Sequence, residues 1–332
     1  MFDFASSPLL ALRTPGERRF RLFFDFVVLW VIAIAVPFLS AFVPGAAATL
    51  ILGVNGLVGL INDALSEGLS GGAGSIDREA FTALTKQITE SEGYRIVELF
   101  GAAWMVAAAI FVCLAVERRS LATMGIVKKG SVKRYGIGAL LGVLLCTVTV
   151  LLSCLTRASS FNGWTGNANY LLILFYLLGY IIQGAAEEVL YHGLFLTTLA
   201  RRMRWLPSVL VSALFFCFMH ATNDGVTVLS LLNVYLFGVF LGLFVIRTGS
   251  VIGASALHAA WNFTEGQIFG CSVSGFQSPA GLFGITADAS RTATNGGAFG
   301  PEGGLAATMV LMLALIAVLF LPTFGKKRQP TP

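Results

Sequence analysis

The stretch YLLILFYLLGYIIQGAAEEVLYHGLFL, residues 170–196, decides the fold class. It is longer than the roughly 20 apolar residues that a helix needs to cross a bilayer. Two adjacent carboxylates, Glu187 and Glu188, nevertheless lie inside it. A charged side chain at the bilayer centre costs at least about 2.5–3.5 kcal/mol on insertion scales, and such residues mark functional sites by default. The stretch therefore predicts both a transmembrane helix and a site within it.

The composition of the whole chain agrees with this assignment. Of its 332 residues, 56% are hydrophobic and only 12% are charged, and the mean hydropathy is +0.81. Soluble domains carry about 25% charged residues. An outer-membrane barrel would instead show alternating segments of about 10 residues. We therefore expect an all-α polytopic membrane protein whose residues 1–332 form one integral membrane domain.

Eight apolar runs are long enough to be spans. They lie near residues 22–43, 96–116, 135–155, 168–190, 205–221, 227–246, 250–269 and 305–322. An even number places both termini on the same side of the membrane. The segment 46–61 is also apolar, and we interpret it as interfacial or re-entrant, because a ninth span would move the cluster Arg13–Arg21 to the other side.

The net charge of +5 comes from short basic clusters beside the predicted spans. This placement follows the positive-inside rule and puts both termini in the cytoplasm. It also argues against nucleic acid as a partner and leaves the lipid bilayer as the surroundings of the chain. Ala- and Gly-rich spans with compact loops are typical of a bacterial inner membrane protein. On this orientation the polar segments 63–95 and 271–304 are extracytoplasmic, the first partly helical and the second, rich in Gly, Ser, Thr and Asn, a flexible loop.

The ionisable and amide residues of the second half of the chain form the candidate site. All three histidines, His192, His220 and His258, lie in or at the ends of apolar runs. Intramembrane ionisable residues usually face one another or water. We therefore expect these histidines to gather with the glutamate pair and Asn262.

Helical spacing divides these residues into sets. His258 and Asn262 are four residues apart and share a helix face, as do Phe216 and His220. Successive residues of a helix point about 100° apart, so Glu187 and Glu188 cannot face the same point. Glu188 and His192 are an i,i+4 pair. We predict that Glu187 faces a shared cavity while His192 holds Glu188.

These residue types predict a hydrolase. A carboxylate and a histidine can take a proton from water, and a second histidine with an amide can donate to the oxyanion that forms when that water attacks a carbonyl. Alternatively, Glu187, His220 and His258 could hold zinc with an open position for water. The residues alone leave both mechanisms open.

Three short motifs carry a resemblance to a known family. They are EEVLYH at 187–192, FCFMH at 216–220 and HAAWN at 258–262. Their order and spacing are similar to EExxxR, FxxxH and HxxxN/B, the motifs of the CPBP intramembrane proteases, also called the ABI or type II CAAX protease family. The resemblance covers about residues 165–265, the core that carries the motifs.

The resemblance implies a fold, an activity and a role for each matching residue. The implied fold is an eight-helix bundle around a water-filled cavity, and the implied activity is intramembrane endopeptidase cleavage of a peptide or membrane-protein substrate. Glu187 and His220 match the residues that activate water, and His258 and Asn262 match the oxyanion-stabilising pair. Glu188 matches the second glutamate, and Phe216 the first residue of the FxxxH motif.

One residue departs from the family pattern. His192 stands where the motif has arginine, which would offer a permanent charge and a two-pronged contact to a carboxylate. We expect activity to fall as His192 loses its proton with rising pH.

Two other functions are compatible with the sequence. A non-catalytic membrane scaffold or bacteriocin-immunity factor would bind a partner through the same residues. A transporter would use the glutamates as a proton relay, although the inverted repeat typical of transporters is not evident.

Overall fold

The computed structural model describes residues 78–89, 91–166, 168–277 and 281–320, together with scattered positions before residue 78. Apart from such positions, the predicted span at 22–43 and the apolar segment 46–61 lie outside the described residues.

The described chain is mostly helical. Its α-helices are α2 (Arg78–Thr89), α3 (Glu92–Gly101), α4 (Ala103–Phe111), α5 (Ser131–Leu155), α6 (Tyr170–Glu187), α7 (Leu196–Arg202), α8 (Trp205–Phe218), α9 (Val228–Thr248), α10 (Val251–Phe263), α11 (Thr292–Asn295) and α12 (Leu305–Phe320). Three π-helical stretches continue α4, α6 and α10, at Val112–Val116, Glu188–Phe195 and Thr264–Ile268. Short 3-10 turns occupy Leu121–Met124, Ala289–Arg291, Gly297–Phe299 and Pro301–Gly303, and the two strands are β1 (Ser159–Trp164) and β2 (Phe283–Ala287).

Several of these helices are long and apolar enough to cross a membrane. Among the described residues they are Glu92–Val116, Ser131–Leu155, Tyr170–Arg202 and Val228–Thr248, and Trp205–Phe218 and Leu305–Phe320 are shorter apolar helices. Each span predicted from residue 96 onward corresponds to one of the observed helices. The prediction of an all-α polytopic membrane protein is confirmed.

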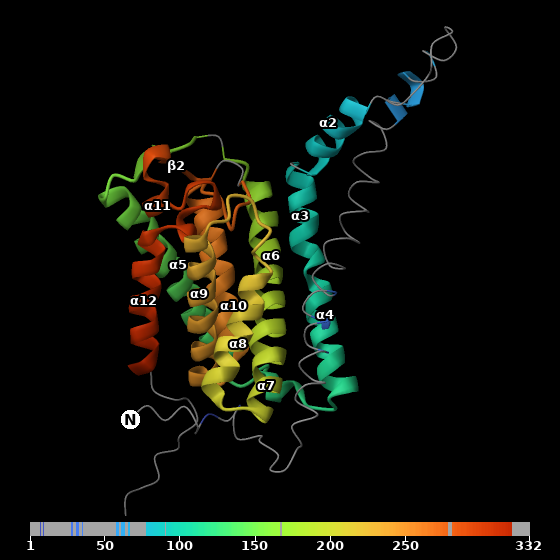
Figure 1. Ribbon diagram of the computed structural model, residues 1–332, viewed down its shortest axis with the longest axis vertical. Coiled ribbons are helices and arrows are strands. Elements are labelled where there is room, and N and C mark those ends of the chain that lie inside the picture. Colours follow the sequence, from blue (N-terminus) through green and yellow to red (C-terminus); the bar gives the residue numbers. More distant parts are fainter. Residues whose placement is uncertain are drawn as a thin grey trace, which may run out of the picture.

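Helix α10 lies at the centre of the bundle, where α5 and α6 approach it closely (Figure 1). Small residues permit this approach. A Cβ added to Gly142 of α5 would lie 2.2 Å from the Leu257 carbonyl oxygen, and one added to Gly184 of α6 would lie 2.8 Å from the Ala259 backbone nitrogen. Close backbone approach at small residues is a common way for membrane helices to pack. It brings the end of α6 directly against α10.

The described residues after α10, 271–277 and 281–304, are folded, which corrects the prediction of a flexible loop at 271–304. Strand β2 pairs antiparallel with β1, the side chain of Phe299 is fully buried, and Asn295 Nδ2 donates to the Ala158 carbonyl oxygen at 2.6 Å. Gly296 and Gly300, which have positive φ, form tight turns here. The glycines that led to the prediction of flexibility instead permit the tight turns of a compact structure. We call β1, β2 and residues 288–304 the cap.

The bundle has two chemically different ends (Figure 1). The cap covers one end. The other end, which we call the basic end, holds Lys128 and Lys129 before α5, Arg201 and Arg202 at the end of α7, and Arg247 at the end of α9. A hydrogen bond joins two segments at the basic end: the Val251 backbone N–H, at the start of α10, donates to the Gly125 carbonyl oxygen at 3.1 Å.

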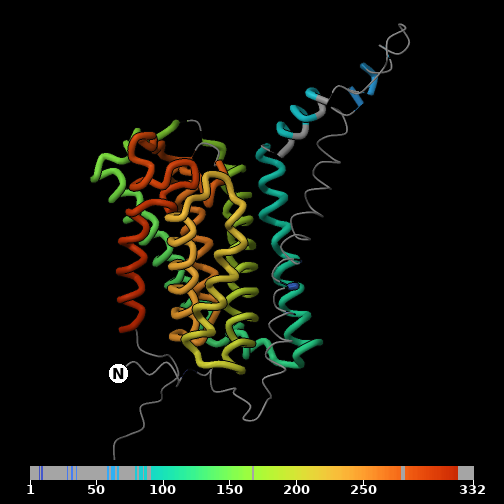
Figure 2. Tube along the Cα trace, in the orientation of Figure 1, coloured from blue at the N-terminus to red at the C-terminus, as the bar shows by residue number. Residues whose placement is uncertain are grey.

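Helices α3 and α4 run beside α6, on the side of the bundle away from α12 (Figure 2). The side chain of Ser91 caps the start of α3 by accepting from the Tyr94 backbone N–H. This pair of helices supplies one wall of the site described next.

Candidate active site

The first motif lies where α6 changes its helical geometry. Helix α6 ends at Glu187, and the π-helical stretch Glu188–Phe195 follows without a break. Sequence spacing alone predicted an ordinary α-helix here. Single-turn π-helices inside longer helices occur frequently at functional sites, and this one places two adjacent glutamates in different surroundings.

Glu188 lies in the protein interior between two histidines. Its side chain is fully buried, with Oε2 2.8 Å from His192 Nδ1 and Oε1 3.0 Å from His258 Nδ1. The predicted pairing of Glu188 with His192 is therefore confirmed. Its contact with His258 was not predicted, because sequence spacing cannot show which residues of two separate helices meet. One carboxylate thus orients a histidine of the first motif and a histidine of the third.

Both ring nitrogens of His192 face acceptors. Besides Glu188 at Nδ1, the Gly238 carbonyl oxygen lies 2.9 Å from Nε2. A carbonyl oxygen can only accept, so the Nε2–H of His192 donates to it, and Nδ1 is the ring nitrogen that contacts Glu188.

The two oxygens of Glu187 differ in their contacts. Oε1 accepts from Gln183 Nε2 at 3.0 Å, whereas Oε2 is buried and has no hydrogen-bond partner among the described residues. His220 Nε2 lies 3.9 Å from Oε2, and His258 Nε2 lies 4.0 Å from it. Polar atoms at such separations are too far apart for a direct hydrogen bond but suit one bridging water.

His220 presents a lone pair to this space. It directly follows the helical turn that ends α8, and its Nδ1 lies 2.9 Å from the Phe216 carbonyl oxygen. Nδ1 therefore donates, which leaves Nε2 of the neutral ring as an acceptor that faces Glu187. The Phe216 ring packs against the imidazole with centroids 4.8 Å apart. The predicted shared face of Phe216 and His220 is confirmed.

Asn262 joins the site through a residue that sequence reasoning missed. Its Nδ2 donates to Gln183 Oε1 at 3.1 Å, and Gln183 in turn donates to Glu187. Gln183 precedes Glu187 by one helical turn in an apolar run, so the spacing that singled out the other polar residues would also have found it. An amide nitrogen carries two hydrogens, and the contact with Gln183 uses one of those on Asn262.

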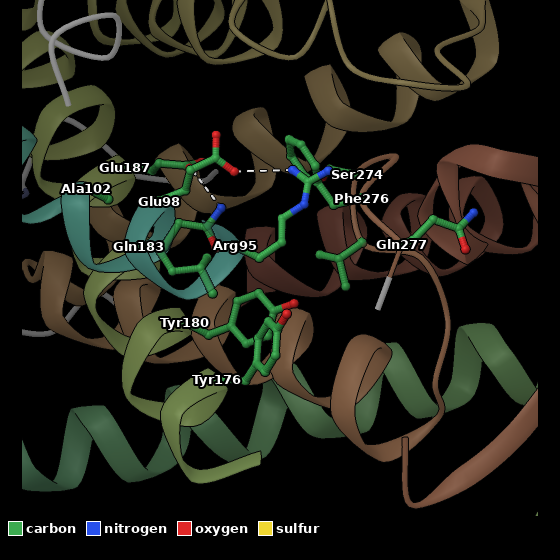
Figure 3. Close-up of a pocket in the computed structure, with 12 residues that line it drawn as sticks. Arg95, Glu98, Ala102, Tyr176, Tyr180, Gln183, Glu187, Ser274, Phe276 and Gln277 are labelled. Atoms are coloured by element: carbon green, nitrogen blue, oxygen red, sulfur yellow. Dashed lines mark hydrogen bonds and ion pairs between the residues drawn. The ribbon is translucent and has the colours of Figure 1, made fainter. Parts of the chain in front are cut away.

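A cavity of about 180 Å³ reaches Glu187 and Gln183 from the side of α3 (Figure 3). Its wall includes Arg95 and Glu98, whose side chains form an ion pair at 3.2 Å. Neither was predicted as a site residue, because nothing in the local sequence of α3 indicates that it faces the motifs.

The zinc alternative was tested against the donor geometry. Across the part of the chain that the structure describes, no group of three or more His, Cys, Asp or Glu side chains is arranged to hold a metal ion.

The structure thus brings Glu187, Glu188, His192, His220 and His258 together, with Asn262 connected through Gln183. The comparison with known families concerns the same part of the chain. A family model described as type II CAAX prenyl endopeptidase Rce1-like matches residues 169–264, the part that carries all three motifs. No curated protein and no solved structure matches the chain.

Proposed function

We propose that this chain, whose residues 169–264 are a domain of the Rce1-like type II CAAX prenyl endopeptidase family, is an intramembrane endopeptidase with Glu187 as its general base. The observation that carries the proposal is the buried Oε2 of Glu187, which has no hydrogen-bond partner among the described residues and lies about equally far from two histidine nitrogens. The Glu187 residue also lines a cavity. A water held between these atoms would be within reach of a base.

In the proposed mechanism Glu187 Oε2, assisted by His220 Nε2, takes a proton from the water. The resulting hydroxide attacks the carbonyl carbon of the substrate peptide bond. Proton abstraction by a positioned side chain contributes about 10²–10⁴-fold to a rate. The proton then passes to the leaving amine as the C–N bond breaks, which returns Glu187 to its starting state.

His258 and Asn262 would stabilise the oxyanion. Glu188 accepts from Nδ1 of His258, and a carboxylate in that position stabilises the imidazolium form, in which Nε2–H also donates. The remaining N–H of Asn262 is a second donor.

The chain is an integral membrane protein, and we infer that it lies in a bacterial inner membrane with both termini in the cytoplasm. The basic end of the bundle supports this orientation, because lysine and arginine accumulate on the cytoplasmic side. Its partners would be the lipid bilayer and a peptide or membrane-protein substrate.

The decisive experiment incubates the detergent-solubilised protein with a quenched fluorescent peptide library, with and without a chelator. Wild-type protein should cleave members of the library, and Glu187→Gln should lose at least about 10²-fold in rate. Glu79→Gln, which changes an exposed glutamate of α2 outside the cavity, is the matched control and should keep cleavage. Unchanged cleavage by Glu187→Gln would remove it as the base, and no cleavage by wild-type protein would favour the scaffold function. Loss of cleavage with chelator alone would restore the zinc alternative.

A further inference from the structure

The cavity that reaches Glu187 has walls from two segments outside the domain matched by the family model. Helix α3 contributes Arg95, and the 273–277 loop contributes Ser274 and Phe276, while Tyr180 of α6 forms the wall between them (Figure 3). The catalytic motifs therefore do not by themselves determine how a substrate arrives.

The position of these walls shows which end of the bundle the cavity faces. Arg95 lies near the start of α3, in its first turn, and the 273–277 loop contacts the cap, since the Gly275 backbone N–H donates to the Phe299 carbonyl oxygen at 2.8 Å. Both segments belong to the capped end of the molecule (Figure 1). The cavity thus faces the end opposite the basic end.

The stretch of chain that runs from Glu187 towards the basic end is buried in the protein. Leu190, Leu194 and Phe195, which follow Glu187 along the π-helical stretch, are each fully buried. Within the described residues, the cavity that reaches Glu187 is therefore lined from the capped side, and the stretch that leads from Glu187 towards the basic end is buried.

A contact between the two outer segments crosses the cavity. The guanidinium of Arg95 lies over the ring of Phe276, 4.4 Å from its centroid, and Glu98 holds the same arginine from within α3. The 273–277 loop is itself a tight turn, in which Val273 and Phe276 exchange backbone hydrogen bonds of 2.9 Å. A cation–π contact at a partly exposed position is weak, so it can open readily.

We propose that the substrate enters between α3 and the 273–277 loop, through a gate formed by Arg95 and Phe276, and is therefore a polypeptide segment on the extracytoplasmic membrane surface. The side of the membrane follows from the basic end, which the positive-inside rule places in the cytoplasm. The inference deepens the proposed function, on which it rests, by assigning the substrate class to one side of the bilayer.

The route is tested first without reference to catalysis. In a background lacking the five native cysteines, Ala102→Cys places a thiol in the cavity wall. A charged, membrane-impermeant methanethiosulfonate is added to right-side-out or inverted membrane vesicles. Lys128→Cys, exposed at the basic end, is the control for orientation. We expect Ala102→Cys to react at least tenfold faster in right-side-out vesicles and Lys128→Cys to show the opposite preference. Faster reaction of Ala102→Cys in inverted vesicles, or no reaction from either side, would overturn the proposed route.

The gate is tested by cross-linking. Arg95→Cys and Phe276→Cys, joined by a short bifunctional maleimide, should reduce modification of Ala102→Cys at least tenfold. The matched control joins Ser160→Cys to Thr286→Cys, two residues that face each other across β1 and β2 in the cap. That cross-link should leave modification unchanged. Equal modification with both cross-links would contradict a gate at Arg95 and Phe276.

Cleavage of the peptide library by the same proteins separates the two proposals. If wild-type protein cleaves in detergent, the Arg95–Phe276 cross-link should stop cleavage and the Ser160–Thr286 cross-link should not. A protein that shows the predicted labelling but no cleavage would retain the route and lose the proposed hydrolase activity.

Discussion

Two adjacent glutamates of one helix differ in almost every physical respect. Glu188 is fully buried, and each of its oxygens contacts a histidine. Glu187 lines a cavity, and its Oε2 has no hydrogen-bond partner in the described part of the chain. Buried polar atoms without hydrogen-bond partners are rare in folded proteins. The paired oxygens of Glu188 hold neighbouring side chains in place, whereas the unpaired Oε2 of Glu187 is available to a ligand or a water molecule. The site therefore has a fixed half around Glu188 and an open half around Glu187.

The largest expected effect is a difference in stability between substitutions in the two halves. Glu188→Gln offers one acceptor and one donor where two imidazole N–H groups need acceptors. Removing one member of a buried charge pair costs about 3–5 kcal/mol, and we expect a loss of this size in the free energy of unfolding. Glu187→Gln should change it by less than about 1 kcal/mol, because its amide oxygen can still accept from Gln183.

Unfolding of the two variants in detergent, followed by circular dichroism, measures this difference. Equal destabilisation by both substitutions would contradict the division into a fixed and an open half.

The second effect concerns His258, which contacts both halves. It bonds to Glu188 through Nδ1 and faces Glu187 through Nε2. Removing one oxyanion donor costs about 10²–10³-fold in turnover, and we expect His258→Ala to lose this much in kcat with a smaller change in KM. Peptide cleavage measures both constants. A variant with unchanged kcat would exclude His258 from the oxyanion site.

The third effect is smaller and concerns how Glu187 is positioned in the open half. Gln183 connects Asn262 to Glu187 without touching the proposed water position. Misplacement of a catalytic group by about 1 Å can reduce a rate by up to about 10²-fold, and we expect Gln183→Ala to lose about tenfold in kcat. Gln183→Glu, which has the same size but lacks the amide donor, should lose at least as much. Full activity of both variants would show that the bridge does not position Glu187.

The smallest effect is a change in the shape of a pH profile. His192 stands where the family motif has a permanently charged arginine, and we expect its support of Glu188 to weaken as the pH rises. Activity of the wild-type protein should therefore fall on the alkaline side. His192→Arg keeps its charge and should maintain activity to higher pH. Profiles of kcat/KM against pH, measured on variants of equal stability, decide the matter, and identical profiles would contradict a role for His192 protonation.

Much of this molecule could be predicted from local sequence features. The apolar runs predicted the helices from residue 96 onward, because spanning a bilayer demands length and hydrophobicity that few other structures need. The four-residue spacings predicted the contacts of His192 with Glu188 and of His220 with Phe216, since such contacts lie within one helical segment.

The features that only the tertiary structure decided are contacts between distant segments. Glu188 meets His258 because α6 and α10 approach closely at Gly184. Arg95 reaches the cavity because α3 runs beside α6, and the segment after residue 271 is ordered by pairing with β1 and by burial of Phe299. Hydropathy and helical periodicity describe only how each segment meets its surroundings. Which side chains of two segments face each other depends on how the helices pack, and no local pattern in the sequence records that.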